Sequence, residues 1–263
     1  MKFVALVSGG KDSIYNIMEC VVHNHELVAL VNLCPSNCED SETIEIDSFM
    51  YQSVGSESVE LISEALGVPV FRMRIQGHSR CKRLLYHECH NDEVEDLYGI
   101  LSRVLSEFPD ITAVSSGAIL SDYQRYRVEN VAYRLGLRSL CFLWQRSQEE
   151  LLEDIISARI EALIIKVASF GLTIGDFLGF RINDVATKLH QLSVPPWSLN
   201  VCGEGGEFET VTLDCPMYRS RIRLVSEPEV VVHSKDPFSP TAYLRLKNLV
   251  LEVSECSIRN LTG

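Results

Sequence analysis

The sequence predicts an α/β fold: a doubly wound, mostly parallel sheet, followed by a smaller α+β domain. Two observations support this prediction. Short apolar segments alternate with segments of helical periodicity through the first 144 residues, a pattern typical of βαβ crossovers. Beyond Pro195 and Pro196 the segments become short and rich in β-branched residues, which favours strands. We therefore expect two domains, residues 1–144 and residues 145–263.

The first strand is expected over residues 2–7, a continuous apolar run of the kind that is buried on both faces of a parallel sheet. A glycine turn ends it. A helix over residues 13–23 follows, because Ile14, Ile17 and Val21 recur at helical spacing. The same criteria predict the remaining elements of this domain: strands over 27–33, 69–75, 112–116 and 139–144, and helices over 47–66, 92–107 and 127–135.

The second domain begins with a helix expected over residues 148–158 and an apolar strand over 162–167. The strands predicted after the proline pair cover residues 209–214, 221–225, 229–233 and 244–252. This part of the chain therefore combines helix with substantial strand content.

The charge balance is acidic. The chain has 24 lysines and arginines against 36 aspartates and glutamates, a formal net charge of −12. Such a surface repels polyphosphate backbones unless cations gather locally, so nucleic acid is not an expected partner. One local exception exists: residues 65–87 contain no acid and hold Arg72, Arg74, Arg80, Lys82 and Arg83. This cluster is a docking surface, a guide for phosphates or simply a solvated face.

Nine cysteines occur without a C-x-x-C pair, which favours reduced thiols over disulfides or a structural zinc site. The apolar run before Ser8 is shorter than the roughly 7 to 15 residues of a signal peptide. The most apolar later stretch, residues 162–172, is interrupted by Lys166 and is too short to cross a membrane. We therefore expect a cytoplasmic protein that does not interact with membranes.

The stretch between the first strand and the first helix has the features of an anion site. Its two glycines allow a sharp turn and a close backbone approach, and the following helix offers N–H groups and a partial positive charge. Asp12 suits Mg2+, directly or through water. The alternative is an ordinary strand-to-helix turn in which Asp12 or Ser13 only caps the helix. The residues of the predicted phosphate site are Ser8, Gly9, Gly10, Lys11, Asp12 and Ser13.

A second polar stretch follows the strand expected over residues 112–116, where ligands gather in a doubly wound sheet. It offers a glycine, an acid, an aromatic ring and two cations, unless it is only a solvated helix N-terminus. Its candidate residues are Gly117, Asp122, Tyr123, Gln124, Arg125 and Arg127.

A third stretch places three carboxylates around a glycine pair just before a predicted strand. Crowded carboxylates repel one another unless a cation lies among them, so ammonium, Mg2+ or a quaternary amine is expected there. The alternative is a solvated hairpin turn. The residues concerned are Glu204, Gly205, Gly206, Glu207, Phe208 and Glu209.

The hexapeptide S-G-G-K-D-S resembles the PP-loop of the N-type ATP pyrophosphatases. That resemblance implies a PP-loop ATPase-like (HUP) sheet, with ATP and Mg2+ as cofactors and AMP as a product. The three stretches together resemble the diphthine–ammonia ligase family, with its S-G-G-K-D-S, G-A-I-x-S-D-Y-Q-R-x-R-V-E-N and E-G-G-E-F/Y-E-T patterns. This implies amidation of diphthine on elongation factor 2, through an acyl adenylate.

Within that resemblance, Lys11 and Asp12 are expected to act in catalysis on ATP, and Gly117 is expected to bind ATP with the loop. The residues expected to bind the substrate are Asp122, Tyr123, Gln124, Arg125, Arg127, Gly205, Gly206 and Phe208. Free ammonium is the expected nitrogen donor, because the chain leaves little room for a glutaminase domain and Cys202 lacks a G-x-C-x-G context. Glu204, Glu207 or Glu209 is expected to bind ammonium and accept its proton, or to hold the trimethylammonio group of diphthine beside Phe208. The residues do not decide between these roles.

Two other functions are compatible with a PP-loop. A tRNA-modifying PP-loop enzyme would need a basic groove and, in many thiolases, a cysteine pair, and the charge of −12 counts against it. A non-catalytic ATP-binding module would not need Asp12 or the glutamate cluster. Formation of AMP distinguishes the second alternative from a ligase.

Overall fold

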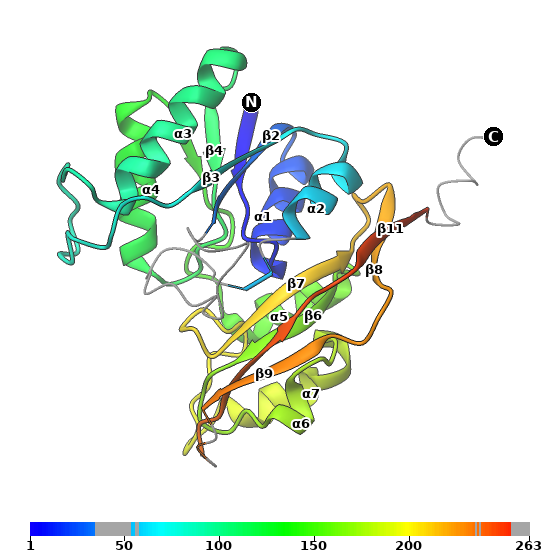
Figure 1. Ribbon diagram of the computed structural model, residues 1–263. Coiled ribbons are helices and arrows are strands. Elements are labelled where there is room, and N and C mark those ends of the chain that lie inside the picture. Colours follow the sequence, from blue (N-terminus) through cyan, green and yellow to red (C-terminus); the bar gives the residue numbers. More distant parts are fainter. Residues whose placement is uncertain (35–53, 56–57, 235, 237, 254–263) are drawn as a thin grey trace. The chain divides into compact units, whose positions relative to one another are not determined.

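The computed structural model describes residues 1–34, 54–55, 58–234, 236 and 238–253 (Figure 1). The chain divides into two compact units, each built from separate stretches of sequence. The first unit holds Met1–Ser8, Ser13–Ser56 and Val68–Gln145, and the second holds Gly9–Asp12, Glu57–Gly67 and Arg146–Gly263. Every helix within the described ranges is too short or too polar to cross a membrane.

A five-stranded, all-parallel sheet forms the first unit, in the order β3-β2-β1-β4-β5. The strand order reverses between β1 and β4, so the predicted α/β fold is confirmed and this boundary is its topological switch point. The strands are β1 (Lys2–Leu6), β2 (Glu26–Cys34), β3 (Val70–Arg74), β4 (Ala113–Ser115) and β5 (Arg138–Leu140).

Helices cover both faces of this sheet. Figure 1 shows α3 (Glu93–Glu107) and α4 (Asp122–Arg134) on one side and α1 (Lys11–Val22) on the other. Val4 lies in the core that α3 and α4 share with the sheet, whereas its neighbour Phe3, equally buried, points to the opposite face. Burial on both faces explains why the strands read as continuous apolar runs.

The second unit contains only antiparallel pairs among its described strands. One sheet has the order β7-β6-β10-β9, and a separate pair joins β11 to β8. The strands are β6 (Glu161–Val167), β7 (Phe208–Asp214), β8 (Ser220–Leu224), β9 (Glu229–Ser234), β10 (Thr241–Arg245) and β11 (Leu249–Val253). This arrangement, together with the helices below, gives the α+β unit that the sequence predicts.

The single strand predicted over residues 244–252 is wrong. The structure has two strands there, and the chain turns between them at Asn248, whose φ is +59°. Because asparagine tolerates the left-handed region better than most residues, this position permits the turn. The turn sends β10 into the larger sheet and β11 to its partner β8.

Four described helices accompany these sheets: α2 (Val59–Leu66), α5 (Gln148–Ser157), α6 (Ile174–Phe177) and α7 (Ile182–Leu192). Helices α5 and α7 contact each other, α7 contacts β6, and α2 contacts β8 and β11. Of the helix predicted over residues 47–66, the part over 47–53 and 56–57 lies outside the described residues. Helix α7 was not predicted, although Ile182, Val185 and Leu189 form a buried stripe at helical spacing.

Most predicted boundaries in the first unit differ from the structure by only one or two residues, but two differ by four or five. Helix α4 begins at Asp122 rather than at residue 127, because Ser121 caps it by accepting a hydrogen bond from the Gln124 N–H (3.3 Å). Strand β5 ends at Leu140 rather than at residue 144, because the chain turns: the Trp144 N–H donates to the Cys141 carbonyl (3.2 Å).

Candidate active site

The loop after β1 lies against β7 by its contacts within the second unit. Gly9 has a φ of +93°, a conformation that glycine adopts without strain. Its carbonyl accepts a hydrogen bond from the Thr212 N–H (2.9 Å), and the Lys11 N–H donates to the Thr210 hydroxyl (3.2 Å). Two threonines far along the chain thus hold the predicted phosphate loop in one conformation.

Lys11 is the cation of this loop and is almost completely buried, with 1% of its side chain exposed. Its Nζ donates to the Cys202 carbonyl and to the Asp12 carboxylate (2.9 Å). The same ammonium lies 5.2 Å from the centroid of the Phe208 ring. A buried charge needs such partners, because desolvation is costly. The structure therefore joins Lys11 and Asp12 to Phe208, as part of one cluster.

Asp12 has a carboxylate oxygen that suits a cation. Its Oδ2 pairs with Lys11, whereas its Oδ1 is buried and has no hydrogen-bond partner among the described residues. The described residues contain no group of three or more His, Cys, Asp or Glu side chains that could hold a metal. A single carboxylate is nevertheless typical for Mg2+ that is bound jointly by protein and substrate phosphates. Asp12 therefore fits Mg2+ of that kind.

The glycine-rich turn before β7 gives Glu207 a defined place. A Cβ atom at Gly205 would lie 2.7 Å from the Glu207 Oε1, so a side chain there would displace this carboxylate. The Asn200 amide donates to Glu207 Oε1 (2.7 Å), and the Glu207 carbonyl accepts from the Ala168 N–H (2.8 Å). The Oε2 of Glu207 is buried without a hydrogen-bond partner in the described part of the chain.

The three predicted glutamates have different surroundings. Glu209 pairs with Lys166 across β6 and β7 (3.1 Å), and both side chains are largely buried, so its charge is already compensated. Glu204 is half-buried and contributes to the raised pKa of the Cys202 thiol. Glu207 alone of the three presents a buried oxygen that lacks a partner in the described part of the chain. The geometry therefore distinguishes Glu207 as the carboxylate best placed to receive a cation.

Cys202 links this turn to α5. Its N–H donates to the Gln148 side-chain oxygen (3.1 Å) and its thiol to the Gln148 carbonyl (3.2 Å). Burial, only partly offset by the nearby Lys11 charge, raises the pKa of the Cys202 thiol to about 12. The thiol is therefore protonated at neutral pH and is not an activated nucleophile.

In the first unit, the carboxyl ends of β1 and β4 are adjacent, with Ala5 paired to Ser115. Ser8 and Gly117 follow these two ends, at the switch point where α/β sheets bind ligands. Ser116 is buried, and its hydroxyl contacts the Cys141 thiol (3.3 Å). Ser8 and Gly117 thus occupy the positions that the sequence predicts for an ATP site.

Arg127 is fully buried, and its guanidinium binds backbone carbonyls of two neighbouring segments. Its guanidinium donates to the carbonyls of Cys81, Arg83 (3.0 Å) and Tyr123 (3.0 Å). It also stacks on the Tyr123 ring, 3.2 Å from the centroid. The Tyr123 hydroxyl in turn hydrogen-bonds Ser79 (2.7 Å). The structure thus places two of the predicted substrate residues, Tyr123 and Arg127, against the segment around residues 79–83.

The remaining predicted residues of α4 lie nearer the surface. Asp122 is exposed, and Gln124 is the residue whose N–H is capped by Ser121. Arg125 pairs with Glu129 (2.6 Å) and lies 4.4 Å from the Trp144 ring centroid, and the hydrogen bond to Glu129 raises the pKa of Arg125. The motif thus divides between a buried anchor, Arg127, and a more accessible cation, Arg125.

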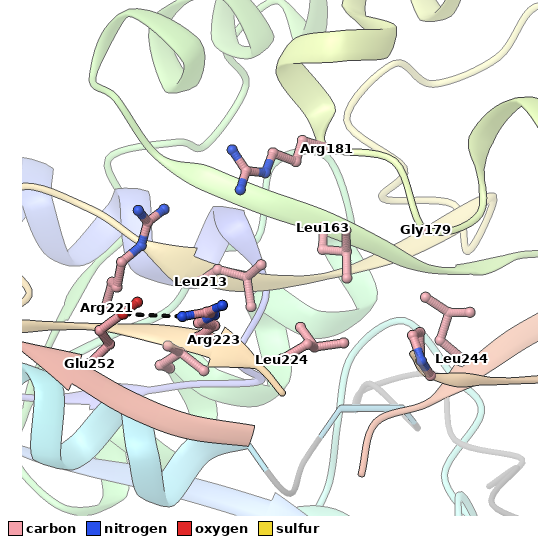
Figure 2. Close-up of a pocket in the computed structure, with 11 residues that line it drawn as sticks. Leu163, Gly179, Arg181, Leu213, Arg221, Arg223, Leu224, Leu244 and Glu252 are labelled. Carbon is pink, nitrogen blue, oxygen red and sulfur yellow. Dashed lines mark hydrogen bonds and ion pairs between the residues drawn. The ribbon is translucent and has the colours of Figure 1, made fainter. Parts of the chain in front are cut away.

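A separate cavity of 490 Å³ occurs in the second unit (Figure 2). Leu163, Leu213 and Leu244 provide apolar lining, and Arg223 forms an ion pair with Glu252 at its edge (3.2 Å). None of the site residues predicted from the sequence lines this cavity. It is therefore not part of the candidate active site.

Several residues of the site were not predicted. Thr210 and Thr212 hold the loop, Gln148 holds Cys202, Asn200 orients Glu207, and Lys166 neutralises Glu209. For Thr210 a signal existed, because it lies inside the third polar stretch. The others lie far from the loop in the sequence, and their roles depend on tertiary contacts that no local pattern reveals.

Comparisons with known proteins identify the family of this chain. The model of the diphthamide synthase N-terminal domain matches residues 1–139, and that of the diphthamide synthase C-terminal domain matches residues 147–240. The diphthine–ammonia ligases of Rattus norvegicus and Homo sapiens are each 48% identical over 258 residues, which cover 98% of this chain and 95% of theirs. That of Schizosaccharomyces pombe is 48% identical over 97% of this chain and 40% of its own length. The chain belongs to the diphthamide synthase family, whose curated members are named diphthine–ammonia ligases.

Proposed function

We propose that this chain is a diphthine–ammonia ligase: it amidates diphthine on elongation factor 2 to diphthamide, consuming ATP and ammonium and releasing AMP and pyrophosphate. The observation that carries the proposal is the ion pair between the buried Lys11 and the partly buried Asp12 in the S-G-G-K-D-S loop. The family membership of the whole chain supports it. A translation factor as substrate is consistent with a cytoplasmic enzyme.

The first step makes the carboxylate reactive. A diphthine carboxylate oxygen attacks the α-phosphorus of ATP, an acyl–phosphate bond forms, and the bond to the β-phosphate oxygen breaks, releasing pyrophosphate. The loop residues Ser8, Gly9, Gly10 and Ser13 would bind the phosphates, and Lys11 would offset their charge. Mg2+ at Asp12 would neutralise the phosphates and orient them.

The second step forms the amide. Ammonia attacks the carbonyl carbon of the acyl adenylate, the bond to the phosphate oxygen breaks, and AMP leaves. Ammonium must first lose a proton, so a carboxylate close to it serves as the base. We assign this role to Glu207, because its Oε2 is buried without a hydrogen-bond partner among the described residues. Glu204 remains the second candidate, whereas Glu209 is neutralised by Lys166.

Substrate binding is assigned to both parts of the chain. Residues 1–144 would bind ATP and, through Asp122, Tyr123, Gln124, Arg125 and Arg127, position the protein substrate. Residues 145–263 would supply the ammonium site around Gly205, Gly206 and Glu207. Phe208 contacts the Lys11 ammonium in the structure, so we propose that it supports this lysine rather than the trimethylammonio group.

The test is a reconstituted reaction with purified protein, ATP, Mg2+, ammonium chloride and elongation factor 2 bearing diphthine. Nucleotide analysis should show AMP, and peptide mass spectrometry should show the carboxylate converted to the amide. If AMP forms only with a substrate other than diphthine-bearing elongation factor 2, the adenylation chemistry would be supported but the proposed substrate would be wrong. Failure to form AMP with this validated substrate would favour a non-catalytic module.

Two variants test the assigned residues. Asp12→Ala should abolish AMP formation while the circular dichroism spectrum stays native, and full activity would remove this loop from the mechanism. Glu207→Gln should raise the ammonium concentration needed for half-maximal rate, with KM for ATP unchanged. The matched control is Glu227→Gln, which alters an exposed carboxylate and should change neither quantity.

A further inference from the structure

The loop between β3 and α3, residues 79–91, is a defined surface element of the first unit. Its ends are close, because the His78 N–H donates to the Asn91 carbonyl (3.0 Å). Compact loops whose ends meet in this way are frequently functional. We call residues 79–91 the β3–α3 loop.

Buried side chains hold the backbone of this loop in place. The carboxylate of Asp92 accepts hydrogen bonds from the N–H groups of Arg80 (3.0 Å) and Cys81 (2.8 Å). From the other side, the Arg127 guanidinium donates to the carbonyls of Cys81 and Arg83. The backbone N–H and carbonyl of Cys81 are thus both hydrogen-bonded, and these bonds fix the backbone conformation at residues 80–83.

A second anchor lies further along the loop. The buried Tyr86 hydroxyl donates to the Glu95 carboxylate (2.8 Å) and accepts from the Cys89 N–H (3.3 Å). Burial, followed by the bond to Glu95, raises the pKa of Tyr86, so its hydroxyl stays protonated. Arg134 pairs with Glu95 as well (2.8 Å), which lowers the pKa of that carboxyl. The loop is therefore organised before any partner binds.

The side chains between these anchors point to solvent. Arg80, Lys82 and Arg83 are exposed, and no carboxylate among the described residues lies within ion-pair distance of them. Leu84 and Leu85 follow, with 51% and 64% of their surfaces exposed. Three unmatched cations beside two exposed leucines are unusual on a chain with a formal net charge of −12.

We propose that the β3–α3 loop is a docking surface for the protein substrate, with Arg80, Lys82 and Arg83 facing an acidic patch and Leu84 and Leu85 contacting apolar residues beside it. Charge complementarity favours such a partner. An acidic patch on the partner is repelled by most of the acidic surface of this chain and is attracted to the cations of this loop. A fixed backbone also lowers the ordering cost of binding. The inference rests on the proposed function.

The test compares two triple variants of the full chain in the amidation reaction. Arg80→Ala/Lys82→Ala/Arg83→Ala should raise KM for diphthine-bearing elongation factor 2 about tenfold, with kcat and KM for ATP unchanged. The control, Arg103→Ala/Lys188→Ala/Lys247→Ala, removes the same charge from exposed sites and should leave all three constants unchanged. Leu84→Ser/Leu85→Ser should raise the same KM.

Salt and direct binding provide independent readouts. Added salt should raise KM for the protein substrate in the wild type more than in the loop variant, because screening weakens the charge pairs that the variant lacks. An unchanged KM in the loop variant, an equal rise in the control, or a loop that binds RNA rather than the protein would overturn the proposal. If the wild type binds elongation factor 2 but forms no AMP with it, the proposed function fails. The docking surface is then tested by comparing the dissociation constants of the loop triple variant and the control triple variant for elongation factor 2.

Discussion

Gly205 lies where a side chain would compete with the Glu207 carboxylate for space. Its missing Cβ would come within 2.7 Å of Glu207 Oε1, whereas the Asn200 amide binds this same oxygen at 2.7 Å. The carboxylate therefore depends on the absence of a neighbouring methyl group as much as on its hydrogen bond. The sequence alone does not reveal this dependence.

Gly205→Ala should therefore reduce activity without unfolding the protein. Glu207 is the flexible end of a side chain and can move aside, so we expect the free energy of unfolding to change by less than about 1 kcal/mol. Ammonium-dependent turnover should fall by about tenfold or more, because the carboxylate is displaced. Gly99→Ala in α3 is the control, since apart from the nearby backbone of its own helix no atom of the described residues lies within 4 Å of the added Cβ. Normal turnover in the Gly205 variant would contradict the role of Glu207.

Cys202 is predicted to be dispensable as a nucleophile. Its pKa of about 12 leaves the thiol protonated, and its Sγ already donates to the Gln148 carbonyl. Cys202→Ser keeps a donor there and should retain ammonium-dependent turnover within about threefold. Iodoacetamide should not label this position in the folded protein, and glutamine should not replace ammonium. Labelling of Cys202 at neutral pH would refute the assignment.

At the scale of elements, helix α4 serves as the anchor of the β3–α3 loop. Arg127→Lys tests this, because lysine retains the charge but lacks the planar guanidinium that binds the carbonyls of Cys81 and Arg83 in the loop. We expect faster amide hydrogen exchange over residues 79–91 and a higher KM for the protein substrate. Arg103→Lys changes an exposed arginine of α3 and is the control. Exchange that is equal in both variants would show that Arg127 does not fix the loop.

The sequence predicted most elements, because their causes are local. Apolar periodicity identified α3, and Asp92 caps it by accepting from the Val94 N–H (3.0 Å). Boundaries were missed where a single residue decides them: the Ser121 cap that extends α4 and the turn at Asn248 that separates β10 from β11. Both signals are present in the sequence, but each competes with a stronger hydrophobic pattern.

The sequence motifs predicted the main residues of the site, but not the residues elsewhere in the chain that hold them in place. Lys11, Asp12 and Phe208 lie in patterns that stand out in the sequence, and the structure brings them together. The hydrogen bond from Thr212 to Gly9 depends on tertiary structure, because about 200 residues separate the two positions. No local pattern specifies such a pair.

At the scale of the whole molecule, three buried thiols make stability sensitive to alkaline pH. Burial raises the pKa of Cys20, Cys202 and Cys215 from 9.0 to about 12. The folded state keeps these protons where the unfolded state loses them. The stabilisation is therefore complete below about pH 9 and falls by about 1.4 kcal/mol per pH unit for each thiol up to about pH 12.

Urea unfolding followed by circular dichroism, from neutral pH to about pH 11, measures this effect. Cys20→Ala/Cys215→Ala should show a shallower decline above about pH 9, even though it is less stable at neutral pH. The slope against pH is the readout, since a general packing defect lowers all values equally. Parallel curves for the variant and the wild type would exclude the thiols as the cause.

Helix α2 packs against β8 and β11, although it precedes them by most of the chain. During synthesis its apolar face, Val59, Ile62 and Leu66, emerges from the ribosome long before residues 220–224 and 249–253 exist to cover it. The loop Gly9–Asp12 likewise cannot form its hydrogen bonds to Thr210 and Thr212 until β7 has been translated. Contacts between segments far apart in the sequence form slowly, and apolar surface stays exposed to solvent until they form. A nascent chain of this protein therefore exposes the apolar face of α2 until β8 and β11 have been translated, and we expect truncated chains that end before β8 to be prone to aggregation.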